Sequence, residues 1–574
     1  MDFRRRLLAG LWLAALFSSA APAAEPPSAG TNLTPMLAAT APWTAALDAA
    51  RQPWLMHYGP DGELIVLKPD GDRRTLVRPA DGHRPSGLSL GRQDEGMGLL
   101  WRDTAPSPGL YFLDAGSADG PRHIESPAAP LTRMQVAQTD RHRLFLWYGE
   151  DAKRPQAERY QIFVRREGNT PDTVETHAVL PGFYPQWIVD ADGSVGVFTW
   201  TGGGLQEMRE VVMRRLDPDA GEFGPLRKVA DTGRVTPIFQ SFRSGARWFV
   251  VWVGQYGQGG AEFLLQGAWS DDRGETWQDF AFESLRGLDV THLSTATDHQ
   301  GHLLLAVSGS YRFREPGARE DIYLLRSADN GRTWEAPLRP RPESARRFHA
   351  RNPNLAFGHD GRVLLAWEDW RTIRPAIHAA RSDDAGKSWH TGALTIAGPD
   401  TNDRLAPQRD ALFATDRGFT LIVERFEDTL TGKTLVRHDV APDTPCRLPA
   451  QAATETMLRA RVERYWQAMQ DGDYGTTYTH LDPFFRARWT EANYRQRMGL
   501  IRYHDLSIED VHVEGPIADV RLRMKASVPE FVRQGQRLSQ PERDIDMTER
   551  WLWVDGNWHR EMIEESSETR YTQY

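Results

Sequence analysis

Between residues 50 and 440 the chain alternates short apolar runs with polar turns that are rich in glycine and aspartate. In the clearest unit, residues 352–357 and 363–367 are two such runs, separated by the turn His359-Asp360-Gly361. Residues 376–382 form a third run, and a further turn leads into a fourth. Short apolar runs bounded by turn residues are typical of β-strands. The pattern therefore predicts a four-stranded antiparallel meander of about fifty residues.

Weaker copies of this unit occur on both sides of it. Each copy has a first run, a turn and a mostly apolar second run; these second runs are residues 96–101, 144–147, 195–200, 248–252 and 419–424. Residues 53–76 are expected to complete the last unit. Closing the units into a ring removes the free sheet edges that otherwise invite aggregation. We therefore expect a ring of six or seven four-stranded units.

One octapeptide occurs three times in the same context. Its copies are Ser270-x-Asp272-x-Gly274-x-Thr276-Trp277, Ser327-x-Asp329-x-Gly331-x-Thr333-Trp334 and Ser382-x-Asp384-x-Gly386-x-Ser388-Trp389, and their starts lie 57 and 55 residues apart. In a tight turn, aspartate accepts hydrogen bonds from backbone N–H groups, and glycine takes the positive φ that the turn needs. Tryptophan buries its ring between neighbouring sheets. We interpret the octapeptides as turns between third and fourth strands, not as catalytic groups or metal ligands.

Over residues 51–440 these repeats resemble the Asp-box, or bacterial neuraminidase repeat, proteins of the sialidase superfamily. The stretch Trp367-Glu368-Asp369-Trp370-Arg371, which precedes the third octapeptide, is also typical of bacterial members. The resemblance implies an all-β propeller of six or seven four-stranded blades with a funnel on one face. It does not by itself imply sialidase activity, because one fold hosts many functions.

The octapeptides also predict where a binding site lies. If they lie at one end of the ring, the first strands begin and the second strands end at the other, which is the mouth of the funnel. The resemblance implies that arginines there hold an acidic sugar, while a Tyr–Glu pair and an Asp act in catalysis. On this basis the candidate catalytic residues are Asp369, Glu424 and Tyr311. The candidate substrate-binding residues are Arg351, Arg371, Arg409, Arg312 and His292.

Two features favour binding without catalysis. Sialidases carry an Arg-Ile-Pro-type motif on an early blade, whereas His83-Arg84-Pro85 lacks that pattern, and no unique Tyr–Glu pair can be assigned. Polar residues also crowd the mouth of any propeller, and a pair such as Asp369 and Arg371 can clasp neighbouring blades. The sequence leaves two functions open. One is an exo-glycosidase of sialidase type, and the other is a non-catalytic scaffold that binds glycans or proteins.

Residues 441–453 contain three prolines and break the repeat, which predicts a linker. Residues 455–469 carry a helical apolar stripe, and further helices are expected at 474–481 and 490–499. Strands are then expected at residues 505–513, 517–526, 546–554 and 557–563. Helices followed by a curved sheet resemble the NTF2-like cone fold over residues 454–574, which implies a ligand pocket or an accessory association module. The aromatic set either lines such a pocket or forms the domain core; it consists of Tyr465, Trp466, Trp551 and His559.

The ends and the charge of the chain narrow its location and partners. Arg4, Arg5 and Arg6, the apolar residues 7–20 and Ala21-Pro22-Ala23 predict a signal peptide over residues 1–23, followed by a disordered leader over 24–50. Cys446 is the single cysteine, so the chain forms no internal disulfide. The formal net charge of -9 gives no reason to expect nucleic acid or an anionic membrane as partner. We expect a soluble periplasmic or secreted protein that binds a carbohydrate or glycoconjugate, without cofactor or metal, and that is a candidate for dimerisation through its C-terminal domain.

Overall fold

The computed structural model describes residues 30–570, apart from residues 80–81, 83–84, 94–95, 106–107, 117–118, 127–128, 131–132, 141, 156–157, 169–173, 191, 202–209, 218–220, 257–261, 391–393, 398–401, 408–409, 442–453 and 565–568. Strands make up most of the described chain, with two 3-10 helices at Glu283–Leu285 and Glu343–Ala345. The α-helices follow residue 454.

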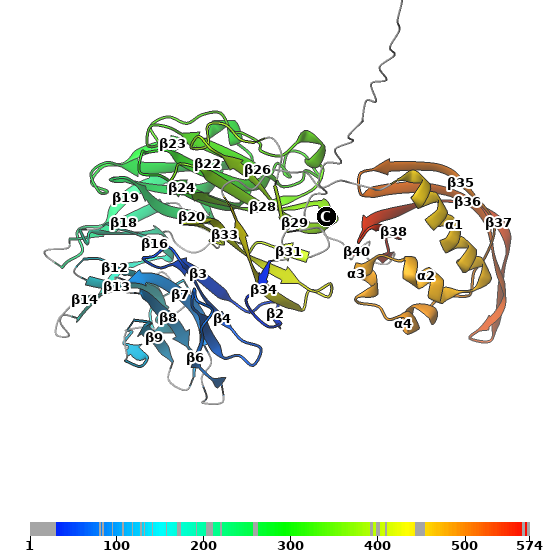
Figure 1. The fold of residues 1–574 in the computed structure, drawn as a ribbon, viewed down its shortest axis with the longest axis horizontal. Helices are drawn as coiled ribbons and strands as arrows, with labels where there is room; N and C mark the ends of the chain where they lie inside the picture. Colours follow the sequence, from blue (N-terminus) through cyan, green and yellow to red (C-terminus); the bar gives the residue numbers. More distant parts are fainter. Residues whose placement is uncertain are drawn as a thin grey trace, which may run out of the picture.

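Up to residue 440 the described residues form eight antiparallel sheets that follow one another along the chain (Figure 1). The first contains β3 (Trp43–Leu47), β4 (Pro53–Tyr58), β5 (Leu64–Leu67) and β6 (Arg73–Val77). The second contains β7 (Pro85–Gln93), β8 (Gly96–Asp103), β9 (Gly109–Asp114) and β10 (Arg122–Ile124). The third contains β11 (Ala129–Pro130), β12 (Gln135–Gln138), β13 (His142–Glu150), β14 (Tyr160–Gly168) and β15 (Val174–Pro181). The fourth contains β16 (Phe183–Val189), β17 (Val195–Thr201), β18 (Glu210–Leu216) and β19 (Arg227–Asp231).

The other four sheets continue in the same order. The fifth contains β20 (Arg234–Ser244), β21 (Arg247–Tyr256), β22 (Glu262–Ser270) and β23 (Gln278–Ala281). The sixth contains β24 (Asp289–Thr297), β25 (Leu303–Ser310) and β26 (Asp321–Ser327). The seventh contains β27 (Ala350–Phe357), β28 (Val363–Thr372), β29 (Arg374–Ser382) and β30 (Leu394–Ala397). The eighth contains β31 (Asn402–Arg404), β32 (Leu412–Thr415), β33 (Gly418–Phe426) and β34 (Gly432–Val440), together with β1 (Thr31–Asn32) and β2 (Leu37–Ala38).

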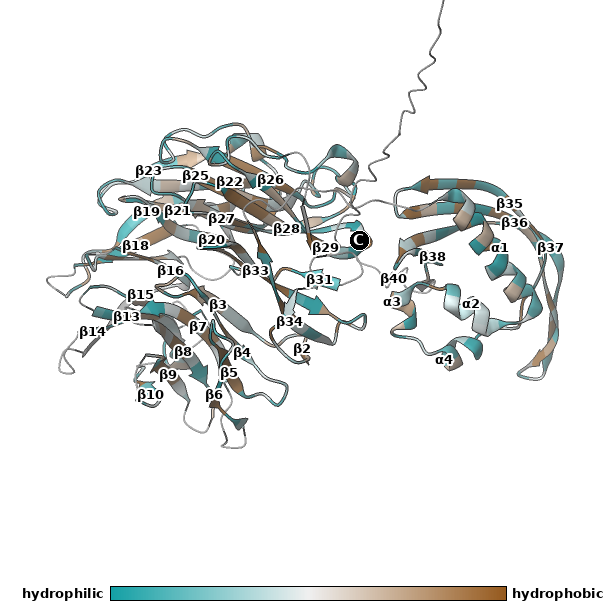
Figure 2. Ribbon diagram, viewed as in Figure 1, coloured by the Kyte–Doolittle hydropathy of each residue, from teal (hydrophilic) through white to brown (hydrophobic). Residues whose placement is uncertain are grey.

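Each sheet shares a hydrophobic core with the next one along the chain, and the eighth packs against the first. At that junction Trp43 Nε1 donates a hydrogen bond to Glu424 Oε1 at 2.7 Å. Arg73 Nη2 also donates to the carbonyl oxygen of Leu33 at 2.6 Å. The sheets therefore close into a ring. Figure 2 shows hydrophobic residues concentrated along their strands and hydrophilic residues in the connecting loops.

The ring contains more sheets than the six or seven that the sequence predicts. Residues 53–76, expected to complete the last unit, instead belong to the first sheet, which forms separately. The eighth sheet is completed by β1 and β2, both of which pair with β34. Leu37 is only 2% exposed in the core between the eighth and first sheets. Burial of this side chain favours strand pairing in a segment that the sequence analysis assigns to a disordered leader.

The three octapeptides form the turns that the sequence predicts. In the first, the Thr276 N–H and hydroxyl donate to the Asp272 carboxylate at 2.8 and 2.6 Å, and the other two copies repeat both bonds. The glycine of each copy has φ between 75° and 86°. In the sixth and seventh sheets these turns contact the turn between the first and second strands, because Asn330 N–H donates to the Gly301 carbonyl at 2.9 Å and Ala385 N–H to that of Gly361 at 3.2 Å. The first strands therefore begin at the opposite end of the ring.

The C-terminal domain contains α1 (Glu455–Asp471), α2 (Tyr474–His480), α3 (Pro483–Arg486), α4 (Glu491–Arg495), β35 (Arg502–Glu514), β36 (Ile517–Arg533), β37 (Gln536–Val554), β38 (Asn557–Arg560), β39 (Ile563–Glu564) and β40 (Thr569–Arg570). Thr454 caps α1 by accepting from Met457 N–H, and Gly472 ends it with φ of 73°. Tyr465, Trp466 and Trp551 are at most 2% exposed in the core between α1 and the sheet, so these aromatics form the domain core. Among the described helices, none is both long and apolar enough to span a membrane.

The C-terminal domain packs on the seventh sheet of the ring. Trp370 and Ile373 of the ring share an apolar cluster with Phe484 and Leu552. Beside this cluster, Arg374 donates from Nε and Nη2 to the carboxylate oxygens of Asp555, both at 3.0 Å. The domain is therefore fixed to the ring by both apolar burial and a paired charge-assisted contact.

Candidate functional site

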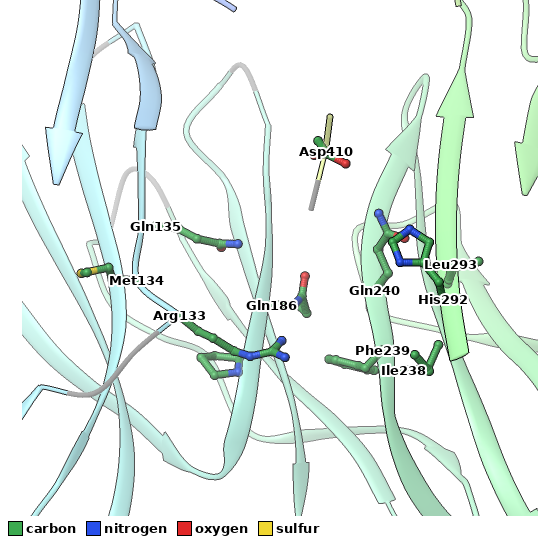
Figure 3. Close-up of a pocket in the computed structure, with 11 residues that line it drawn as sticks. Arg133, Met134, Gln135, Gln186, Ile238, Phe239, Gln240, His292, Leu293 and Asp410 are labelled. Carbon is green, nitrogen blue, oxygen red and sulfur yellow. The ribbon is translucent and has the colours of Figure 1, made fainter. Parts of the chain in front are cut away.

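A cavity of about 290 Å³ is lined by residues from five sheets of the ring (Figure 3). It is lined by Arg133, Met134, Gln135, Pro185, Gln186, Ile238, Phe239, Gln240, His292, Leu293 and Asp410. These residues belong to, or directly precede, β12, β16, β20, β24 and β32 of the third, fourth, fifth, sixth and eighth sheets. The cavity therefore lies on the axis of the ring, at the level of the middle of β16, β20 and β24. Below it is called the axial cavity.

Two residues at the entrance of the axial cavity have a left-handed backbone conformation. Arg133 has φ of 66° and Tyr184 has φ of 51°, and each lies two residues before a glutamine of the cavity. Neither residue is glycine or asparagine, so this conformation carries a cost of about 1 kcal/mol or more. The Arg133 guanidinium lies over the Tyr184 ring, 4.5 Å from its centre. Residues with a strained backbone cluster at ligand sites. A binding site needs particular side-chain directions, and a relaxed strand would point these side chains elsewhere.

Side-chain amides form much of the polar wall. The register places Gln135 and Gln240 at the same level of their sheets, each opposite the residue that precedes a buried tryptophan of the second strand. Gln186 enters the cavity after a register shift in the fourth sheet. Figure 3 shows all three amides directed toward the cavity. Gln135 Oε1 is buried and accepts no hydrogen bond from the described residues, so a ligand N–H or O–H would gain an acceptor there.

Desolvation shifts the pKa values of the titratable groups that line the cavity. His292 is 2% exposed, and burial lowers its pKa to about 4, although a hydrogen bond to the carbonyl of Pro353 favours the charged form. Its imidazole is therefore neutral at pH 7. Desolvation also raises the pKa of Asp410, although its side chain keeps solvent-exposed surface in the cavity. Burial lowers the pKa of the Arg133 guanidinium, which nevertheless stays charged at pH 7.

Asp369, a candidate catalytic residue, is enclosed by its own partners. Its side chain has no exposed surface, and it accepts bonds from Arg341 Nε at 3.0 Å and Trp367 Nε1 at 2.9 Å. Arg371, a candidate substrate-binding residue, donates to it from Nε at 2.9 Å and Nη2 at 2.6 Å. Burial by itself raises the pKa of Asp369, but Arg341 and Arg371 outweigh burial and hold it far below its usual range. Asp369 and Arg371 both lie on β28, so their pair joins residues of one strand, whereas Arg341 ties the carboxylate to the segment before β27.

The remaining predicted residues lie at several separate places. Glu424 accepts from Trp43 Nε1 and from Lys433 Nζ, both at 2.7 Å, at the junction of the eighth and first sheets. Tyr311 packs edge-on against Tyr323, and burial raises its pKa. Arg312 pairs with Asp289 at 2.5 Å, Arg351 pairs with Glu320, and Arg409 lies outside the described residues. Of the predicted residues that the structure describes, His292 alone lines the axial cavity.

The other polar residues of the cavity are not among the candidate residues predicted from the sequence. Gln186 and Asn354 each end an X-Pro-amide triplet at the start of a repeat unit, Tyr184-Pro185-Gln186 and Asn352-Pro353-Asn354. An amide recurs directly after the proline, inside an otherwise apolar strand. This recurrence is the sequence signal that indicates residues near the axis of the ring. Asp410 carries no such local signal, since it is brought to the cavity by ring closure.

No protein-family model matches the sequence, and no curated protein matches it either. Among solved structures, a polysaccharide lyase is 9% identical over 62% of this chain and 90% of its own, with a TM-score of 0.42. A prolyl endopeptidase is 12% identical over 69% of this chain and 56% of its own, with a TM-score of 0.39. A neuraminidase-like protein of A/flat-faced bat/Peru is 9% identical over 53% of this chain and 91% of its own, with a TM-score of 0.31. These proteins are named for different activities, so function has to be derived from the residues of this chain.

Proposed function

We propose that this chain is an exported β-propeller protein that binds glycans, and that the axial cavity holds one terminal sugar residue. The observation that carries the proposal is the convergence of three glutamine side chains, Arg133 and Asp410 on one cavity from four sheets. Each amide offers both a hydrogen-bond donor and an acceptor, as each sugar hydroxyl does. A wall of amides therefore matches a hydroxyl-rich ligand better than an apolar or a fully charged one.

The size and charge of the cavity narrow the ligand. Its volume of about 290 Å³ is near the lower end of the roughly 300–1,000 Å³ range of small-molecule pockets, which suits a single sugar ring. Arg133 supplies a positive charge to the cavity wall, and the three glutamines add no charge of either sign. A sugar with one carboxylate is favoured over a neutral one for this reason.

Binding without bond cleavage is supported over sialidase-type hydrolysis. A catalytic acid or nucleophile has to touch the sugar, whereas Asp369 is fully enclosed, and Glu424 and Tyr311 are not among the residues that line the cavity. The residues of the cavity itself offer recognition chemistry. We therefore assign the ring to glycan recognition and the C-terminal domain to an accessory role, with its aromatic residues used for its own core.

The proposal is tested by saturation-transfer NMR and calorimetric titration with N-acetylneuraminic acid, D-glucuronic acid and D-galactose. We expect at least one acidic sugar to bind, and Gln186→Leu with Gln240→Leu to weaken it by about tenfold or more, since two amide contacts are lost. Gln138→Leu is the matched control, because Gln138 lies at the far end of β12 and is not among the cavity residues. Equal binding by the double variant, or no binding of any of the three sugars by the wild type, would overturn the proposal.

A further inference from the structure

Side chains of the seventh sheet hold the backbone of the eighth sheet on both sides of Asp410. Asn352 Nδ2 donates to the carbonyl oxygen of Leu405 at 3.0 Å, and Leu405 N–H donates to Glu368 Oε2 at 3.2 Å. Beyond Asp410, Ala411 N–H donates to Asn354 Oδ1 at 3.0 Å. The chain that carries Asp410 into the axial cavity is therefore anchored before and after it.

These anchors are buried, which makes them costly to remove. Glu368 and Asn354 are each 3% exposed, Leu405 is 1% exposed and Ala411 is 0% exposed. A buried backbone N–H that loses its acceptor has no water to replace it. The backbone at Leu405 and Ala411 would have to move toward solvent or to another acceptor, and Asp410 would move with it.

The stretch Asn352-Pro353-Asn354 also orients His292. The carbonyl oxygen of Pro353, between the two asparagines, accepts a hydrogen bond from the His292 ring. Asn352 has φ of 51° and lies beside a register shift between β27 and β28, which turns its side chain toward the eighth sheet. Asparagine tolerates this left-handed conformation better than most residues. One bulge of β27 thus contacts both neighbouring sheets that line the cavity, the sixth through His292 and the eighth through Leu405.

Glu368 is held in turn by Trp370 of the ring, against which the C-terminal domain packs. Trp370 Nε1 donates to Glu368 Oε1 at 2.8 Å, so both carboxylate oxygens of Glu368 accept from N–H donors. Trp370 is 2% exposed and packs in the cluster with Phe484 and Leu552. Because every donor around Glu368 is an N–H group, a side chain with only one acceptor oxygen can satisfy one anchor and not both.

We propose that Asn352, Asn354 and Glu368 are positioning residues, which set the places of Asp410 and His292 in the axial cavity, and that the C-terminal domain orients Glu368 through Trp370. Only the effect on sugar affinity rests on the proposed function; the effect on the backbone of the eighth sheet does not. These three residues touch no ligand themselves and act through the wall of the cavity.

The test is Glu368→Gln, which keeps the shape of the side chain but turns an N–H₂ group toward Trp370 or Leu405. Asn352→Gly is the second variant, because glycine keeps the left-handed backbone and removes only the amide. Asp190→Asn is the matched control: Asp190 is a buried carboxylate that accepts from Trp248 Nε1 at 3.2 Å, outside the cavity. Hydrogen–deuterium exchange is measured by mass spectrometry, and affinity is titrated with N-acetylneuraminic acid and D-glucuronic acid.

We expect both variants to speed exchange on the order of tenfold in peptides that contain Leu405 or Ala411, with other ring peptides unchanged. Affinity for the sugar is expected to fall by about fivefold or more, while Asp190→Asn changes neither quantity. Unchanged exchange in these peptides overturns the proposal, and so does faster exchange spread evenly over the ring. If no sugar binds even the wild type, the proposed function fails, while the exchange data still decide the positioning role.

Discussion

The octapeptide turns and the axial cavity use the same kinds of side chain for opposite purposes. In the octapeptide turns, the oxygens of Asp272, Asp329 and Asp384 are occupied by donors of their own turns. On the axis of the ring, Gln135 and Asp410 face the cavity, and Arg133 has a strained backbone. The comparison teaches that a polar group whose hydrogen bonds are satisfied locally serves the fold, whereas one whose capacity stays open is available to a ligand.

Asp369 tests this distinction, because its carboxylate is fully paired within the protein and should therefore stabilise the fold and not act in catalysis. We predict that Asp369→Ala lowers the free energy of unfolding by about 3–5 kcal/mol, because the buried Arg341 and Arg371 are left without their carboxylate. Urea denaturation followed by tryptophan fluorescence measures the loss. Asp369→Asn serves as the isosteric comparison and is expected to cost less than alanine. If the variant kept wild-type stability but lost a measurable glycosidase activity, Asp369 would be a catalytic residue and the prediction would be wrong.

A matched pair of aspartates sharpens the comparison directly. Asp329→Asn is expected to cost about 1 kcal/mol of stability, since its turn bonds weaken, and to leave sugar affinity unchanged. Asp410→Asn is expected to do the reverse, weakening sugar binding by about tenfold without loss of stability. Thermal unfolding and calorimetric titration of both variants check this. Loss of stability in Asp410→Asn, with binding intact, would show that the turns and the cavity are not divided in this way.

The smallest expected effect is on the pH dependence of stability, which has opposite signs for the octapeptide aspartates and for Asp410. Burial raises the pKa of Asp329 and Asp384, but bonds from Thr333 and Ser388 outweigh burial and lower each pKa to about 2, from an ordinary value of 3.8. Their stabilising contribution is thus complete above pH ~4 and is lost as the pH falls toward 2. The pKa of Asp410 is raised, so its ionisation costs stability as the pH rises above 3.8.

We therefore expect the difference in melting temperature between wild type and Asp329→Asn to shrink between pH 5 and pH 2. The difference between Asp410→Asn and wild type is expected to grow in favour of the variant as the pH rises to 7. Differential scanning calorimetry across this range measures both, at constant ionic strength. If the melting-temperature difference changed with pH by the same slope for both variants, the opposite pKa shifts of Asp329 and Asp410 would be contradicted.

The sequence predicted the ring better than it predicted the site. The octapeptide turns could be read from four or five consecutive residues, because every bond in them joins residues at most four positions apart. The number of sheets could not, since the eighth sheet borrows β1 and β2 from the other end of the described chain. Asp369 looked like an exposed catalytic candidate because the partner that encloses it, Arg341, lies 28 residues away.

The sequence by itself determined the local structure: a repeated antiparallel unit, its turns, a break near residue 441 and a second domain of helices followed by strands. It did so because turn bonds and strand periodicity depend on neighbours along the chain. Only the tertiary structure decided which polar residues are free to meet a ligand. Gln135, Gln186, Gln240 and Asp410 share a wall solely because eight sheets close around one axis, and Glu368 holds that wall because a separate domain packs against Trp370. Burial and pairing are set by contacts between distant segments, and no short pattern encodes them.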